Sequence, residues 1–168
     1  SIGFYGSTLN TRQYATKGYL EKLIAQVFTG RERFEPGNPQ EGYSPSPQER
    51  QSWLQISYMK EAYHTMGPKF TLGWMAEALY SSKNFSENYT ATMMQAGEFA
   101  PTPHSKLMYN EAFRANQYVA AGIKPIYVLN DMFQFRTEFY GFTPIFPIKK
   151  NALNKAYYGK AFSRFEYM

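Results

Sequence analysis

A strict alternation of apolar and polar residues over positions 132–142 constrains the fold of this chain more than any other feature. One side of the alternation carries Phe133, Phe135, Thr137 and Phe139, and the other carries Gln134, Arg136, Glu138 and Tyr140. Successive side chains of a β-strand point to opposite faces, so a period of two separates these two sets. The pattern predicts a strand with one face suited to a core or to lipid and one suited to water.

Further segments have the same character, and β-forming residues with Gly/Pro punctuation dominate the chain. The segment 69–80 carries an unbroken apolar face of Phe70, Leu72, Trp74, Ala76, Ala78 and Tyr80. We also predict strands at 2–8, 19–29, 53–63 and 117–129. Both faces of 19–29 are mixed, so an amphipathic helix remains an alternative there. The fold class is therefore all-β and antiparallel.

The predicted connections differ in length. Turns at 9–11, 66–68 and 130–131 are short, whereas loops 30–51 and 81–116 are long. Pro144 and Pro147 take the chain out of the sheet, and 149–160 is expected to be a polar loop. Short turns on one rim and long loops on the other are typical of transmembrane barrels, whose strands run to about 9–11 residues. A soluble antiparallel sandwich or lipocalin-like barrel is the alternative.

Composition agrees with a barrel wall. Aromatic residues make up 18% of the 168 residues, yet the mean hydropathy is −0.53, as expected of strands that are only half apolar. The net charge is +5, but the cations are scattered, which argues against a nucleic-acid partner. No apolar run approaches the ~18 residues of a membrane helix. The first and last residues fall within predicted strands, so we expect a fragment.

Candidate catalytic and ligand-binding residues are not found. The chain has no cysteine and no Gly-x-Ser-x-Gly, and its one aspartate is Asp131. His64 and His104 stand 40 residues apart without acidic companions, which does not favour a metal site. We predict no catalysis, no metal and no cofactor for this segment. The aromatic residues are expected in girdles or a core rather than in a stacking platform.

Residues 8–18, TLNTRQYATKG, resemble the strand–turn–strand signature of the outer-membrane assembly-factor barrels, also called the bacterial surface-antigen superfamily, with Ala15 where proline is common. A closer resemblance is to the C-terminal barrel of patatin-like phospholipases from Bacteroidota. It rests on RQYATKG (12–18), TPHSK (102–106), NEAFRANQY (110–118), GIKPIY (122–127) and FRTEFYGFTPIFPIKKN (135–151).

This resemblance implies a partial barrel domain over 1–168, with six or seven strands of a barrel of about sixteen. The segment would anchor its parent in the bacterial outer membrane and pass or display an attached patatin-like lipase. Its partners would be the lipid bilayer and the remaining barrel strands. Two alternatives remain open: part of a barrel-assembly insertase, and a soluble β-sheet binding module.

The resemblance also implies roles for particular residues. Loop 81–116 would fold back into the barrel, with Arg114 pinned to an acidic group on the inner wall. Glu77 and Glu138 are the candidate partners, and a solvated Arg114 is the alternative. Ala115 stands where that family has glycine. The lipid-facing candidates are Phe70, Leu72, Trp74, Phe133, Phe135 and Phe139.

Overall fold

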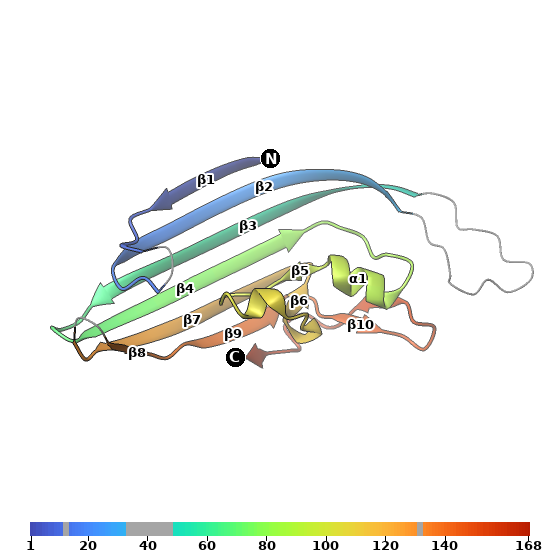
Figure 1. Ribbon diagram of the computed structural model, residues 1–168. Coiled ribbons are helices and arrows are strands. Elements are labelled where there is room, and N and C mark those ends of the chain that lie inside the picture. The colour runs from blue at the N-terminus through green and yellow to red at the C-terminus, as the bar shows by residue number, and fades with distance from the viewer. Residues whose placement is uncertain (12–13, 33–48, 131–132) are drawn as a thin grey trace, which may run out of the picture.

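One curved antiparallel sheet forms most of the molecule, a computed structural model that describes residues 1–11, 14–32, 49–130 and 133–168 (Figure 1). Its strands follow the order β1-β2-β3-β4-β7-β9-β12, and β8 also pairs with β7. Neighbours in the chain are neighbours in the sheet, except where one excursion separates β4 from β7 and a second separates β9 from β12. The predicted all-β antiparallel fold is confirmed.

The sheet strands are β1 (Ile2–Ser7), β2 (Gly18–Glu32), β3 (Glu49–Thr65), β4 (Phe70–Ser81), β7 (Gln117–Val128), β8 (Gln134–Arg136), β9 (Phe139–Pro144) and β12 (Glu166–Tyr167). Segment 19–29 is thus a strand rather than a helix. The predicted loop 30–51 is shorter than expected, because β2 and β3 stay paired as far as Glu32 and Glu49. The turn at 130–131 lies partly outside the described residues.

β8 and β9 form one strand with a break. β8 pairs Arg136 with Ile126, and β9 pairs Phe139 with Ile123, so both follow the same register along β7. Pro125 lies opposite the break at Thr137, and its carbonyl accepts the Thr137 N–H at 3.1 Å. Proline has no N–H to return that bond, so the ladder is interrupted there. The predicted strand 132–142 therefore exists, over residues 134–144, with a proline-induced gap.

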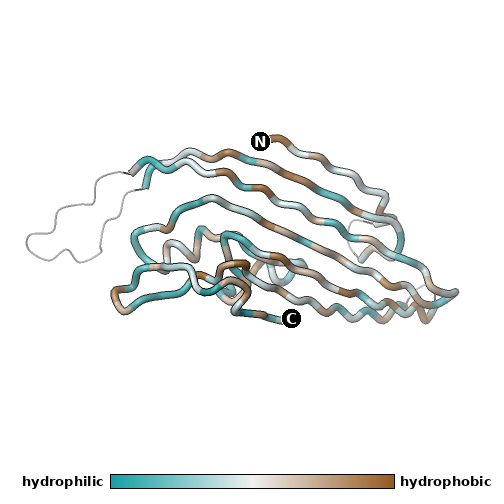
Figure 2. The backbone as a smooth tube through the Cα atoms, turned by 180° about the vertical axis from the view of Figure 1, so that it is seen from behind, coloured by the Kyte–Doolittle hydropathy of each residue, from teal (hydrophilic) through white to brown (hydrophobic). Residues whose placement is uncertain are grey.

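The two faces of the sheet have opposite characters. On β4, Thr71, Met75 and Leu79 are buried on the inner face, whereas Phe70 and Tyr80 are exposed on the outer face. β7 repeats the pattern, with Tyr118 fully buried and Ile123 51% exposed. Brown apolar residues recur along the strands in Figure 2. Large apolar side chains are therefore exposed along the outer face, whereas a water-soluble sheet usually turns a polar face to solvent.

Two glycines on the inner face allow tyrosine rings to lie flat across the sheet. Gly73 pairs with Tyr63, and Gly122 pairs with Tyr140. A Cβ added at Gly122 would lie 2.2 Å from the Tyr140 ring and 2.9 Å from the Phe139 carbonyl oxygen. A glycine within a strand often marks such a close approach. Each pair lets a tyrosine ring pack on the inner face of the sheet without pushing the strands apart.

The excursion between β4 and β7 folds back over the inner face (Figure 1). It contains helix α1 (Tyr89–Gln95), the short pair β5 (Gly97–Glu98) and β6 (Arg114–Ala115), and 3₁₀ turns at Ser105–Leu107 and Glu111–Phe113. Asn88 caps α1 by accepting the Ala91 N–H at 2.7 Å. Within the described residues, no helix is both long and apolar enough to cross a membrane.

A second excursion follows β9, which ends at Pro144, beyond the predicted strand end at Phe142. Segment 149–160 is more ordered than the predicted polar loop. β10 (Ile148–Lys150) pairs with β11 (Ala156–Tyr158) as a hairpin beside α1. Asn151 accepts N–H bonds from Leu153 and Lys155, which closes the hairpin turn.

The glycine–tyrosine packing gives a test of this fold. Gly122→Ala should destabilise the sheet by about 1–3 kcal/mol, because the added methyl overpacks against a ring and a backbone oxygen. The measurement is the urea midpoint of the full-length protein in detergent micelles. Gly67→Ala is the control, since nothing lies within 4 Å of the added Cβ there. Equal midpoints for the two variants would contradict the proposed packing.

Candidate functional site

A buried ion pair lies at the centre of the inner face. The Lys124 ammonium on β7 lies 2.6 Å from the Glu61 carboxylate on β3, and the two side chains are only 6% and 14% exposed. Alternation places both residues on the inward side of their strands, where Ile126 and Tyr63 also point. A buried charge is tolerated only when it is paired, so each residue depends on the other.

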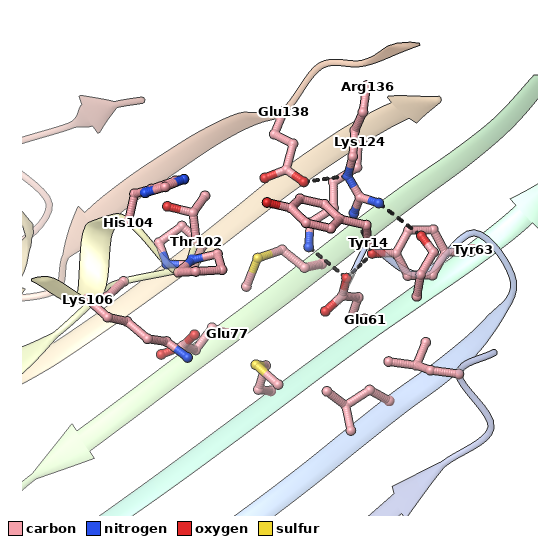
Figure 3. A pocket seen from close by; sticks show the side chains of 18 of the residues that line it. Tyr14, Glu61, Tyr63, Glu77, Thr102, His104, Lys106, Lys124, Arg136 and Glu138 are labelled. Carbon is pink, nitrogen blue, oxygen red and sulfur yellow. Dashed lines mark hydrogen bonds and ion pairs between the residues drawn. The ribbon is translucent and has the colours of Figure 1, made fainter. Parts of the chain in front are cut away.

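The pair extends into a chain of hydrogen bonds across the sheet (Figure 3). The Tyr63 hydroxyl donates to Glu61 and accepts from Arg136 Nη2 at 2.8 Å. Arg136 Nε donates to Glu138 at 2.6 Å, and the Tyr140 hydroxyl donates to the second Glu138 oxygen, also at 2.6 Å. Positively and negatively charged side chains alternate along this series of hydrogen bonds. We call these six residues, Glu61, Tyr63, Lys124, Arg136, Glu138 and Tyr140, the wall network.

Arg136 also holds the connection between β1 and β2 against the sheet. Its Nη1 donates to the Ala15 carbonyl at 3.0 Å. Ala15 is only 4% exposed and packs with Leu9, Tyr63 and Ile126. The described part of this connection therefore lies over the inner face at the short-turn end. The sequence predicts only a simple turn here, because no local signal links two residues that are 121 positions apart.

Aromatic packing holds the 82–116 excursion against the inner face of the sheet. Phe99 is 1% exposed and stacks with Phe142 at 5.9 Å between ring centroids. The surrounding core consists of Met75, Leu79, Phe113, Ala115, Tyr118, Ala120, Tyr140 and Phe142. The Tyr118 hydroxyl donates to Glu77 at 2.5 Å and lies 3.2 Å from the Glu98 carbonyl oxygen, which brings the sheet and the excursion together.

Arg114 is bound within the excursion. Its Nη2 lies 2.6 Å from Glu98, its direct partner in the β5–β6 register. Its Nη1 donates to the carbonyls of Met94 at 3.0 Å and Ala96 at 3.3 Å, at the C-terminal end of α1. A cation there is favoured by the exposed carbonyls and the helix dipole.

The predicted partners of Arg114 are therefore wrong. Glu77 bonds to Tyr118, and Glu138 belongs to the wall network. The alternative of a solvated Arg114 is wrong too, since its side chain is only 12% exposed. Glu98 was missed because its place opposite Arg114 depends on a two-residue strand pair with no sequence signal of its own.

Other polar contacts hold the far end of the excursion. The Tyr89 hydroxyl donates to Glu111, and burial together with this bond raises the pKa of Tyr89 to about 12. Asn116 Nδ2 donates to the Tyr158 hydroxyl at 3.1 Å, which connects the excursion to the β10–β11 hairpin. The two excursions thus support each other at the long-loop end of the sheet.

A cavity of about 1170 Å³ lies between the wall, the β1–β2 connection and the 82–116 excursion (Figure 3). Its lining includes Glu61, Glu77, Lys124, Arg136 and Glu138 from the wall, Tyr14 and Ala15 from the connection, and His104 and Lys106 from the excursion. Side chains of both charges face this space. Most of them are already paired with each other in the wall network, Lys124 with Glu61 and Arg136 with Glu138. Such a lining suits water or a polar chain segment rather than an ion of one sign.

Five of the six lipid-facing candidates share the outer face. Phe70 pairs with Tyr127, and Phe139 pairs with Ile123, all on the exposed side. Phe135 is 67% exposed. Leu72 and Trp74 are half-buried by their neighbours on the same face, and Phe133 lies 63% exposed just before β8. The structure brings the five strand residues among them to one surface: Phe70, Leu72, Trp74, Phe135 and Phe139.

Within the described ranges, no group of three or more His, Cys, Asp or Glu residues is arranged to hold a metal ion. The predicted turn residue Asp131 lies outside those ranges. Comparisons with known protein families, curated proteins and solved structures found no match to this chain.

Arg114→Ala should loosen the excursion. Each hydrogen bond to a charged group contributes about 1.5–3 kcal/mol, so local opening, and with it protease cleavage between β5 and β6, should rise about tenfold or more. The measurement is limited proteolysis of the full-length protein followed by mass spectrometry. Arg31→Ala, at an exposed strand position, should leave the cleavage rate unchanged. If the Arg114 variant resists cleavage as the wild type does, the excursion does not depend on this guanidinium.

Proposed function

We propose that this chain is part of the wall of an outer-membrane β-barrel that anchors its parent protein in the membrane. The observation that carries the proposal is the exposure of the outer face: large apolar side chains lie bare there, whereas the inner face, with its buried Lys124–Glu61 pair, is covered by the chain's own excursion. Lipid would cover the apolar face, and the barrel interior would hold the wall network.

The outer face supports contact with lipid. Phe4, Val27 and Ile123 are 59%, 74% and 51% exposed, on three different strands. Soluble monomers seldom expose contiguous apolar patches larger than a few hundred Å². Hydrocarbon removes the cost of this exposure, and a paired sheet satisfies the backbone polar groups that lipid cannot.

The ends of the sheet support the same orientation. Tyr127 and Phe135 form a cross-strand pair at the short-turn end, with Phe70 beside Tyr127. Exposed aromatic side chains at a strand end suit the girdle of a membrane interface. The long excursions gather at the other end, which would be the outer side of the membrane (Figure 1).

The resemblance to barrels of patatin-like phospholipases extends this proposal. The parent would carry a lipase domain, and the barrel would anchor it and pass or display it. Hydrolysis would belong to that domain, since this segment carries no Gly-x-Ser-x-Gly.

Two neighbouring residues of β2 test the proposal. Leu23 lies on the outer face opposite Tyr58, and Ile24 lies on the inner face opposite Ser57. Leu23→Arg should lower the stability of the membrane-assembled protein by about 2–4 kcal/mol, the cost of a cation at the bilayer midplane. Ile24→Arg should be milder, because it faces the interior. Protease-resistant full-length protein in the membrane fraction is the readout.

Equal assembly of the two variants would overturn the assignment of the faces. Release of the wild-type protein from membranes by carbonate, without detergent, would overturn the barrel proposal and favour a soluble β-sheet module. These two outcomes are distinct, because the first concerns which face meets lipid and the second concerns whether lipid is met at all.

A further inference from the structure

The β10–β11 hairpin stands on a fixed base at the long-loop end. Ile148 is 3% exposed and packs with Met93 and Ala96 of the α1 region. The ring of Tyr158 lies 4.4 Å from the ring of Phe85, between centroids. The turn is closed by the side chain of Asn151. The hairpin therefore projects in a defined direction.

Its free surface is strongly basic. Lys149, Lys150, Lys155 and Lys160 are all exposed, and none forms an ion pair with a residue in the described part of the chain. No aspartate or glutamate occurs anywhere in residues 139–165. Elsewhere on the structure, Lys124 and Arg136 each meet a carboxylate. These four lysines therefore give the hairpin and the residues after it an unneutralised positive charge, which attracts anions.

An apolar tip lies within this patch. Leu153 is 79% exposed at the hairpin turn, between Lys150 and Lys155 in the chain. Tyr157 is 46% exposed and pairs across the hairpin with Lys149. Lysines around an exposed apolar residue suit a partner that is both anionic and apolar, since the cations meet its charges while the tip enters its hydrocarbon.

We propose that this hairpin binds the phosphate groups of anionic lipids at the membrane surface beside the barrel. The proposal rests on the proposed function, because it needs the long-loop end to lie at a membrane face. Lys149 follows Pro144, the last residue of β9, by five residues, a reach of at most about 18 Å. That reach keeps Lys149 close to the long-loop end of the sheet, where the proposed function places the headgroup region, and lysine ammonium groups bind phosphate as compact point charges.

The test uses the full-length protein in micelles of an uncharged detergent, with lipid A, a diphosphorylated acylated disaccharide, as the probe. The double variant Lys150→Glu/Lys155→Glu should weaken binding at least tenfold, since each surface lysine contributes roughly a fivefold effect toward anionic lipid. The matched control is Lys17→Glu/Lys69→Glu, with the same charge change on exposed lysines at the short-turn end. Binding to the control should equal that of the wild type.

Leu153→Ser tests the choice of lipid over a soluble phosphate. It should weaken binding of lipid A but not of its deacylated, still phosphorylated disaccharide. Unchanged lipid A binding in the lysine variant, equal loss in the control, or equal affinity for the deacylated probe would each overturn the proposal. The carbonate extraction separates the two proposals. If the wild-type protein stays in carbonate-washed membranes, any of these three results contradicts the lipid-binding proposal and leaves the barrel proposal unaffected.

Discussion

The ion pair of Lys124 and Glu61 is the interaction on which the rest of the wall depends. The two residues belong to strands separated by β4, and Gly73 makes their approach possible. A Cβ at Gly73 would lie 2.6 Å from the Tyr63 ring and 3.1 Å from Cβ of Lys124. Without a side chain at that point, the Tyr63 ring crosses β4 and its hydroxyl reaches Glu61 and Arg136. Charge neutralisation and close packing are therefore achieved at the same place.

The same network links the ends of the inner space. Arg136 binds the β1–β2 connection through Ala15, while Glu138 orients Tyr140, whose ring packs against Phe99 of the long excursion. Breaking one ion pair would thus weaken the contacts of both segments that cover the cavity, the β1–β2 connection and the long excursion. Coupled polar groups of this kind stabilise one arrangement when all are satisfied and destabilise it when one is lost.

The sequence was sufficient to predict those features that depend on local geometry. Alternation around Phe135 placed each residue on its face, because the strand repeat of two is local. Arg114 shows the limit: its partner Glu98 is set by a two-residue pairing that only the folded excursion creates. The contact of Arg136 with Ala15 has the same origin, since it joins segments brought together by the whole sheet. Long-range partners follow from topology, which the pattern alone leaves open.

How the excursion is held has a consequence for the proposed barrel. Arg114 forms its hydrogen bonds with Glu98 and with the α1 carbonyls, so they connect parts of the excursion to one another and not to the sheet. Its attachment to the wall runs chiefly through Phe99, Phe113 and their apolar neighbours. Apolar contacts are not screened by salt, whereas a guanidinium pinned to the wall would be more sensitive to ionic strength. Any movement of the excursion in the barrel would thus cost buried apolar area rather than ion pairs, and it would leave the wall network intact.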